Sequence, residues 1–593
     1  MRPSKLDPRL LTLLHSWQID NPPVAEPGHG MRILAARTLA RRVAPRAARG
    51  TAAVAAPPAV AARVFLETRP SAKLEAPGAT SVSKIVDGVW TATIPVADVP
   101  AVVSHRSVLR ATLARKLRPL LDKALPKVRV PQFRARTGTT GASVVVGIID
   151  SGIDAKHPAF SGRIISVWDQ VRPGTGVAEG AYGIELAGAN LARSRDTDGH
   201  GTHVAGIAAG NDPVFGGLAP GASIVAVRTT MEDTDIADAI RYVFRVAQAH
   251  NMPAVINLSI GGHDDGHDGS DPLCRVIDEA SGPGRIVCCA AGNEGDDNIH
   301  GIARVTRGDE VGMRFHVPVS SVKEASLTGW YSPASRLDVA VRTPDGKVTP
   351  FQAVIGGGGT PTHSYRLSGT DIIITTPGPD PANGDYNFRV TLRSATRGDS
   401  VRQGIWQLRV RLASGPAVNC HVWTLDDAEE PEVVFTGSSH SDTMKVGSPG
   451  SASRAVTAAS FTTRADWTDQ NGDVIELGYA LGKVTSFSSE GPLRNRGRKP
   501  DITAPGGGIV SARSHLSHPD PEDVISDDFV VLSGTSMATP FVAGLVALML
   551  ERDARLTPEQ VKRRLKAASR IPGGKAGSFD IKWGYGLVDA NRL

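Results

Sequence analysis

The sequence has few cysteines and no long apolar run, and each scarcity excludes a class of protein. Four cysteines in 593 residues are too few for a disulfide framework. The longest apolar segment, residues 541–550, is half as long as the roughly 20 residues that a membrane-spanning helix needs. Hydrophobic residues nevertheless make up 41% of the chain and charged residues 21%, which excludes a disordered chain. These values predict a soluble, multidomain protein with no membrane partner.

Basic residues are concentrated near the N-terminus. Residues 1–135 carry 22 Lys and Arg but only 8 Asp and Glu, whereas the whole chain has a net charge of +6, so the remainder is acidic. Such asymmetry is typical of nucleic-acid binding or of one part of the chain binding another. No interleaved aromatic residues or nucleic-acid motif accompany the basic ones, so we expect no nucleic-acid partner. Residues 1–20 also lack the apolar segment of a signal peptide, which favours the cytoplasm, with non-classical export as the alternative.

Composition and periodicity divide the chain into five parts. Strands alternate with helices in one discontinuous part, which predicts an α/β doubly wound parallel sheet. About eight short alternating strands interrupt it, which predicts an inserted β-sandwich or jelly roll. The predicted parts are a Pro/Ala/Arg-rich flexible segment at 1–60, a small α+β domain at 61–115, a basic linker at 116–140, the α/β domain at 141–300 and 445–593, and the insert at 301–444.

Four polar residues lie where the predicted sheet would present them together. Asp150 ends an apolar strand, Asn293 follows another, and His200 and Ser536 each begin a helix. Because the carboxyl ends of parallel strands meet at one edge, we expect these residues to be neighbours. Acyl transfer by a serine needs a hydroxyl, a base, a carboxylate that orients the base, and donors for the developing oxyanion. The pattern therefore predicts nucleophilic catalysis.

Six sequence blocks in order resemble those of the subtilisin-like serine proteases, or subtilases: VGIIDSGID, HGTHVAG, INLSIGG, AAGNEG, KPDITAPG and GTSMATPFVAG. The chain order Asp, His, Ser is also that of this family. The resemblance implies a serine endopeptidase for peptide or protein substrates that needs no cofactor or metal. It implies that Ser536 is the nucleophile, His200 the general base, Asp150 the residue that orients His200, and Asn293 an oxyanion-hole donor.

The same resemblance implies which residues contact the substrate. The residue before the scissile bond would enter a pocket lined by two short segments with small side chains, which leave room for a large apolar group. The implied substrate-binding residues are Ser259, Gly261, Ala291 and Gly292.

Two further features resemble a narrower group. The predicted insert between Asn293 and Ser536 resembles that of the Csp-type bacterial subtilases. The domain at 61–115 resembles a subtilase propeptide, which would dock on the acidic body of the chain. We therefore interpret the protein as an enzyme autoprocessed or autoinhibited by its N-terminal domain, and we expect the insert to lie beside the cleft and to restrict or recruit substrates.

Other interpretations stay open. A pseudoprotease scaffold would have no need of four intact site residues, and a peptide ligase would need a site that excludes water, which no sequence feature indicates. His263 and His267 lie in the acidic loop HDDGHDGSD, whose spacing fits no zinc signature, so we expect a solvated or substrate-side loop. His203 has no catalytic role in the family pattern, so we expect a structural one.

Overall fold

The computed structural model divides the chain into two compact units, before and after residue 118. The predicted flexible segment 1–60 lies outside the residues that the structure describes. The described residues are 61–69, 79, 81–86, 89–113, 124–319, 322–353, 362–396, 398–426 and 432–593.

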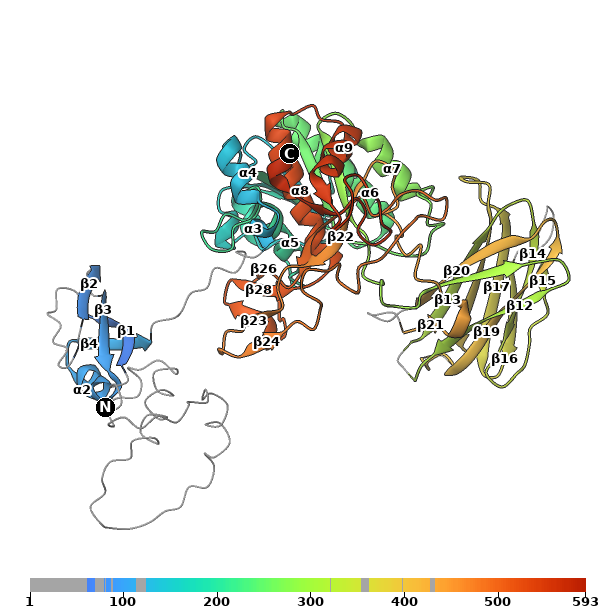
Figure 1. Ribbon diagram of the computed structural model, residues 1–593, viewed down its shortest axis with the longest axis horizontal. Coiled ribbons are helices and arrows are strands. Elements are labelled where there is room, and N and C mark those ends of the chain that lie inside the picture. Colours follow the sequence, from blue (N-terminus) through green and yellow to red (C-terminus); the bar gives the residue numbers. More distant parts are fainter. Residues whose placement is uncertain are drawn as a thin grey trace, which may run out of the picture. The chain divides into compact units, whose positions relative to one another are not determined.

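In its described residues, the first unit has a four-stranded antiparallel sheet and one short α-helix, α2 (Val99–Ser104), preceded by η2 (Val96–Asp98) (Figure 1). Alternation along the first strand turns Val64 and Leu66 inward, where they pack with Val102 and Val103 of α2. The unit is thus α+β, with its own apolar core. Its strands, in the order β2-β3-β1-β4, are β1 (Ala61–Thr68), β2 (Ser81–Val86), β3 (Val89–Pro95) and β4 (Val108–Leu113).

The second unit contains a ten-stranded sheet whose eight central strands are parallel. The edge strands β29 and β7 pair antiparallel with their neighbours. In sheet order the strands are β29 (Ser569–Arg570), β30 (Leu587–Val588), β25 (Ile502–Gly507), β22 (Val456–Thr462), β10 (Arg285–Ala290), β9 (Ala254–Leu258), β5 (Val145–Asp150), β8 (Ser223–Arg228), β6 (Ile164–Asp169) and β7 (Ile184–Ala187).

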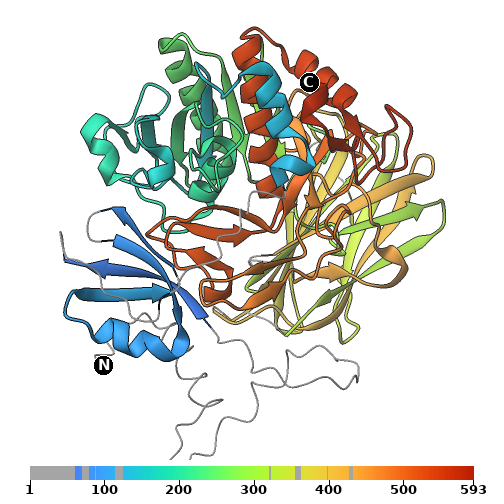
Figure 2. The ribbon, with the colours of Figure 1, turned by 60° about the vertical axis from the view of Figure 1, so that its left-hand side comes forward.

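Helices cover both faces of this sheet, so its central strands are buried on both sides (Figure 2). Cys288 and Cys289, adjacent in β10, belong to the cores on opposite faces, as expected for a strand. One face packs against α5 (His200–Ala209), α8 (Thr535–Arg552) and α9 (Pro558–Ala568), and the other against α6 (Asp233–Ala249) and α7 (Pro272–Ala280). The sequence prediction of a doubly wound α/β sheet is confirmed.

The insert is a pair of antiparallel sheets that share one apolar core. Consecutive strands β11 to β14 alternate between the sheets, an arrangement typical of jelly rolls. The six-stranded sheet contains β11 (His300–Val305), β20 (Val418–Asp426), β13 (Glu324–Tyr331), β18 (Tyr386–Ser394), β17 (Thr370–Pro379) and β16 (Thr362–Leu367). The five-stranded sheet contains β15 (Gln352–Ala353), β14 (Arg336–Arg342), β19 (Gly404–Ser414), β12 (Glu310–Val317) and β21 (Val434–Phe435).

Smaller elements complete the second unit. Two short sheets lie near one another in sequence: β23 (Asp466–Thr468) with β24 (Val474–Glu476), and β26 (Ile509–Ala512) with β28 (Phe529–Leu532) and β27 (Val524–Ser526). Its 3₁₀ helices among the described residues are η3 (Pro158–Phe160), η4 (Gly188–Arg193), η5 (Gly437–Ser439), η6 (Pro521–Asp523) and η7 (Ala590–Arg592).

The second half of the predicted linker at 116–140 is structured instead. Residues from 124 onward form α3 (Ala124–Lys127) and α4 (Val130–Thr137), the cyan helices beside α8 in Figure 2. Phe133 is fully buried in the core of the α/β domain, and Arg129 forms an ion pair with Asp589. The linker prediction was wrong here because the segment is rich in Lys and Arg. The few apolar residues that anchor α4 therefore form no recognisable helical pattern.

Replacing Phe133 by Ala should therefore destabilise the α/β domain rather than leave it unchanged. Losing a fully buried phenylalanine costs about 3–5 kcal/mol of folding free energy, because the cavity collapses only partly. Thermal unfolding followed by circular dichroism should show a lower midpoint for Phe133→Ala. The exposed neighbour Gln132, changed to Ala, is the control and should leave the midpoint in place. Equal midpoints for both variants would contradict the packing of α4 on the core.

Candidate active site

Asp150 is the last residue of β5 and is completely buried. Its Oδ1 accepts hydrogen bonds from the backbone N–H of Ser151 at 2.7 Å and from Nδ1 of His200 at 2.8 Å. Because a carboxylate can only accept, the proton on this side of the His200 ring lies on Nδ1. The other ring nitrogen, Nε2, is therefore left to accept a proton.

The first turn of α5 brings His200 to Asp150. His200 is the first residue of the helix, and Gly201 packs directly on the turn that follows Asp150. A Cβ atom at Gly201 would lie 2.1 Å from the carbonyl oxygen of Gly152, so any side chain there would push the helix away. The contact between Gly152 and Gly201 thus sets the separation between the Asp150 carboxylate and the His200 imidazole.

Negative charges surround the His200 ring. Burial opposes its protonation, but the charge and hydrogen bond of Asp150, together with the charges of Asp198 and Asp196, raise the pKa of His200 to about 9. Asp198 also accepts a hydrogen bond from the backbone N–H of His200 at 3.0 Å. The ring is therefore a stronger base than an isolated imidazole.

Ser536 lies in the first turn of α8, beside the end of β9. Its hydroxyl donates to the carbonyl oxygen of Ser259 at 3.2 Å, and the Ser259 hydroxyl donates to the Ser536 carbonyl at 2.7 Å. Within the described residues no hydrogen bond joins Ser536 to His200. Catalytic hydrogen bonds of this kind are often long or misaligned without substrate.

The amide of Asn293 is oriented by Thr535, the first residue of α8. The Thr535 backbone N–H and hydroxyl both donate to Asn293 Oδ1, each at 2.9 Å. A backbone N–H can only donate, so the atom facing it must be the amide oxygen. The Asn293 NH₂ group is therefore turned away from Thr535 and is available as a donor, as is the Ser536 N–H in the first turn of the helix.

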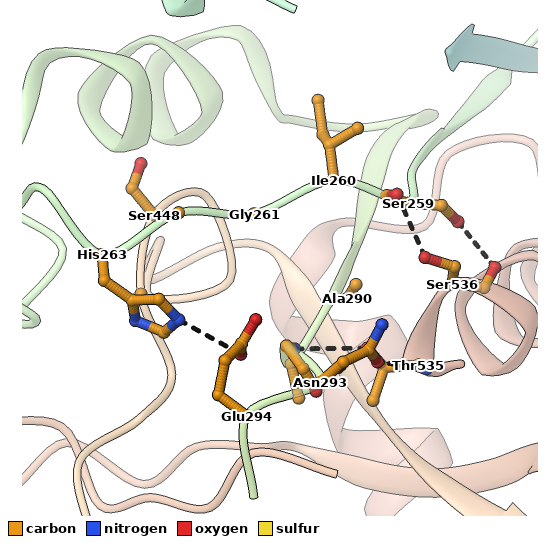
Figure 3. Close-up of a pocket in the computed structure, with 14 residues that line it drawn as sticks. Ser259, Ile260, Gly261, His263, Ala290, Asn293, Glu294, Ser448, Thr535 and Ser536 are labelled. Atoms are coloured by element: carbon orange, nitrogen blue, oxygen red, sulfur yellow. Dashed lines mark hydrogen bonds and ion pairs between the residues drawn. The ribbon is translucent and has the colours of Figure 1, made fainter. Parts of the chain in front are cut away.

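A pocket of about 190 Å³ extends from Ser536 between the segments that follow β9 and β10 (Figure 3). The structure brings the predicted substrate-binding residues together here, and small side chains form both walls. His263 lines its far end together with Glu294, which the sequence analysis did not single out. The lining residues are Ser259, Ile260, Gly261, Gly262, His263, Ala290, Ala291, Gly292, Asn293, Glu294, Gly447, Ser448, Thr535 and Ser536.

The acidic loop that contains His263 is largely enclosed. His267 is fully buried and its ring stacks on Trp423 of the insert, with centroids 3.9 Å apart and planes 4° apart. Asp265 is also buried, so of the two expected environments the loop is not solvated at these two residues, and His263 lines the pocket. Packing of the insert against the loop excludes the solvent.

The insert also holds this loop through charges. Arg494 pairs with Asp268 of the loop at 2.7 Å and with Asp385 of the insert. Arg389 of the insert pairs with Asp264 at 2.5 Å. The insert therefore contacts the segment that supplies one end of the pocket.

His203, which we expected to be structural, lies in the same helix as His200. It is fully buried, and its Nε2 lies 3.1 Å and 3.2 Å from the carbonyl oxygens of Ile509 and Val530. Burial lowers its pKa to about 3, so the ring is neutral and bridges α5 to two strands.

Sequence reasoning also missed Thr535 and Ser489. Thr535 orients Asn293, and the Ser489 hydroxyl donates to Glu294 at 2.8 Å. Thr535 could have been found because it precedes Ser536 at the start of a helix, whereas nothing local distinguishes Ser489 from other serines.

The sequence profile of the subtilase family matches residues 141–351 and 389–586, more than half of the chain. The chain belongs to the subtilase family. This subtilase is 24% identical over 480 residues to the serine protease AprX of Bacillus subtilis strain 168, covering 78% of this chain and 69% of that protein.

It is also 25% identical over 522 residues to the PIII-type proteinase of Lactococcus lactis subsp. cremoris strain SK11, covering 79% of this chain. The chain spans about a quarter of the length of that proteinase, 25%. Among solved structures, the CspB protease of Clostridium perfringens superimposes with a TM-score of 0.65 at 23% identity, over 79% of this chain and 96% of that one. The likeness to CspB shows a shared fold.

In the described parts of this subtilase, no helix is long and apolar enough to cross a membrane. Nor do three or more His, Cys, Asp or Glu side chains come together there in a group that could hold a metal ion.

Replacing Thr535 by Val should lower kcat about tenfold with little change in KM. The change removes the hydroxyl that holds Asn293 but keeps the backbone N–H bond. The loss should be smaller than the about 10²–10³-fold cost of losing an oxyanion donor itself, a figure that comes from this family. Thr535→Ser should restore turnover. Thr539→Val, one turn later, removes a hydroxyl bonded only to a helix carbonyl and is the control. Equal kcat in both valine variants would exclude a positioning role for Thr535.

The pH dependence of kcat/KM should reflect the raised pKa of His200. His200 accepts a proton only when neutral, so kcat/KM should rise with pH, with a midpoint above 6.5 and toward about 9. Asp198→Asn keeps the oxygen that accepts from the His200 N–H but removes a charge that raises this pKa, so the midpoint should move to lower pH. Asp212→Asn is the control, because the Asp212 carboxylate lies in a loop and is not among the causes of the raised pKa of His200. A midpoint unmoved by Asp198→Asn would disprove the electrostatic argument.

Proposed function

We propose that the protein is a serine endopeptidase that hydrolyses peptide bonds through an acyl-enzyme on Ser536. The observation that carries the proposal is the convergence of the Asp150–His200 pair, the Ser536 turn and the Asn293 amide at the carboxyl ends of three adjacent strands, β5, β9 and β10. The two relatives described above are both named as proteinases, which supports the same activity.

Acylation begins when the Ser536 hydroxyl turns from Ser259 toward His200. Nε2 of His200 takes the proton as Oγ attacks the substrate carbonyl carbon, while Asp150 holds Nδ1 and stabilises the imidazolium. The carbon–nitrogen bond then breaks, and His200 returns the proton to the departing amine. Water, deprotonated by His200 in its turn, hydrolyses the ester and releases the acid and the free Ser536 hydroxyl.

The negative charge on the substrate oxygen would be met by two donors. One is the NH₂ group of Asn293, which Thr535 aims away from the helix, and the other is the backbone N–H of Ser536. Both belong to or contact the first turn of α8, where the helix dipole adds positive potential. Because Thr535 fixes the amide before substrate binds, little reorganisation is needed during the reaction.

We further propose that the N-terminal unit inhibits the enzyme until the chain is cut between the two units. The unit has its own core around α2, and the chain before residue 136 is strongly basic while the remainder is acidic. These properties suit a separately folded domain that docks on the body by charge. Autoprocessing would leave the α/β domain and insert as the mature enzyme.

Intact-mass measurement of the full chain, before and after fluorophosphonate treatment, tests both parts. The wild type should gain one label and lose an N-terminal fragment ending within residues 114–123, before the helices that pack on the α/β core. Ser536→Ala should stay unlabelled and full length, because the nucleophile is absent. Ser533→Ala, which removes a nearby hydroxyl bonded to the Gly508 N–H, is the matched control and should still label.

The outcomes separate the two proposals. A wild type that labels but stays full length would refute autoprocessing and leave the peptidase standing. A wild type that neither labels nor cleaves a panel of peptides, even when started near residue 124, would refute the peptidase itself.

A further inference from the structure

The far end of the pocket holds an ion pair. Figure 3 shows His263 and Glu294 at the end remote from Ser536, with a contact between them. Nε2 of His263 lies 3.1 Å from Oε2 of Glu294, and this same oxygen accepts from the Ser489 hydroxyl at 2.8 Å. The Glu294 side chain remains 22% exposed, and within the described residues no other side chain donates to its second oxygen, Oε1.

A count of protons gives the charge at this end. His267 Nδ1 lies 3.1 Å from the carbonyl oxygen of Asp265, and His267 Nε2 lies 3.0 Å from Nδ1 of His263. Three hydrogen bonds, to Glu294, between the rings and to the carbonyl, need three N–H groups, but two neutral rings supply only two. The two histidines therefore carry one positive charge between them.

That charge belongs on His263. Burial opposes charge on both rings, but the neighbouring carboxylate of Glu294 raises the pKa of His263, whereas burial and the charge of His263 keep the pKa of His267 well below its ordinary value. Burial also opposes the Glu294 charge, yet His263 lowers the pKa of Glu294. His263 and Glu294 thus form an ion pair that has no net charge of its own.

Every side-chain donor at this end is already used. Both N–H groups of His263 are committed, the Ser489 hydroxyl donates to Glu294, and the Ser448 hydroxyl donates to Asp271 at 2.9 Å. The far end therefore offers an acceptor, Glu294 Oε1, and no free side-chain donor. At the mouth of the pocket, the end beside Ser536, the NH₂ group of Asn293 is a donor, but it lies where the oxyanion would form.

The walls between mouth and end carry almost no side chain. Gly261 and Gly262 form one wall and Ala290 to Gly292 the other. A Cβ atom at Gly292 would lie 2.6 Å from Glu294 Oε2, so glycine is needed there to admit the carboxylate. A long, unbranched substrate side chain can therefore reach Glu294.

We propose that the Glu294–His263 pair makes the pocket select a substrate residue whose side chain ends in N–H donors, an amide or a cationic group, over apolar and acidic ones. An apolar group would bury Oε1 without a partner, which is costly for a charged acceptor, and an acidic group would meet a second carboxylate and no donor. This selection replaces the large apolar residue expected from the small pocket walls. The inference rests on the proposed peptidase activity.

Peptides that differ only in the residue before the scissile bond test the selection, with kcat/KM measured on enzyme counted by fluorophosphonate labelling. For the wild type, Gln and Lys should exceed Leu by at least about tenfold and Glu by more. Because the ion pair has no net charge, Gln and Lys should lie close to each other.

Two substitutions should change the selection in opposite directions. His263→Gln leaves Glu294 without its cation, so the Lys/Gln ratio should rise about tenfold. Glu294→Gln leaves His263 without its anion, so Lys should lose its advantage over Leu and Glu should gain. The double variant restores neutrality and should accept Gln without preferring Lys. Asp264→Asn, on the same loop but paired with Arg389 outside the pocket, is the charge-matched control.

Labelling separates failure of this inference from failure of the peptidase proposal. An enzyme that labels fully but prefers Leu or Phe, or whose ratios are the same in all variants, would overturn the selection and leave the peptidase intact. An enzyme that neither labels nor cleaves would overturn both. If Glu294→Gln does not fold, as absence of label would show, the His263→Gln and double variants still decide the matter.

Discussion

The first turn of α8 is where distant parts of the chain meet through hydrogen bonds. Thr535 donates to Asn293 across 242 residues, and Ser536 exchanges two bonds with Ser259 across 277. Parallel strands bring the turns after β9 and β10 to one edge of the sheet, and these bonds fix the helix to that edge. Ser536, the Asn293 amide and one pocket wall all depend on this junction.

The same junction tolerates a large insertion. The sandwich leaves the α/β domain after Asn293, and Gly301 and His440 at its two ends form a β-bridge. The chain thus departs and returns at nearly the same point, so the insert does not force apart the segments on either side. Its core is separate from the two cores of the α/β sheet, and it can be added without repacking them.

Sequence alone predicted the α/β sheet and the residues at the strand ends, because apolar periodicity and glycine-rich turns are local signals. Asp150, His200, Asn293 and Ser536 could be named for this reason. Glu294 follows Asn293 directly but could not be assigned, since its role depends on His263 and Ser489, which are distant in sequence. Helix α4 was missed because Phe133 finds its apolar partners only after the sheet forms.

The stack of His267 on Trp423 joins the pocket to the insert in a way that limits how the two can change. His267 transmits its orientation to His263 by a 3.0 Å hydrogen bond, while Trp423 lies in β20 of the sandwich. A chimaera that receives a foreign sandwich would therefore inherit a different support for its pocket. The pocket residues and the insert would have to be exchanged together. During evolution, too, a substitution in one would require a matching change in the other.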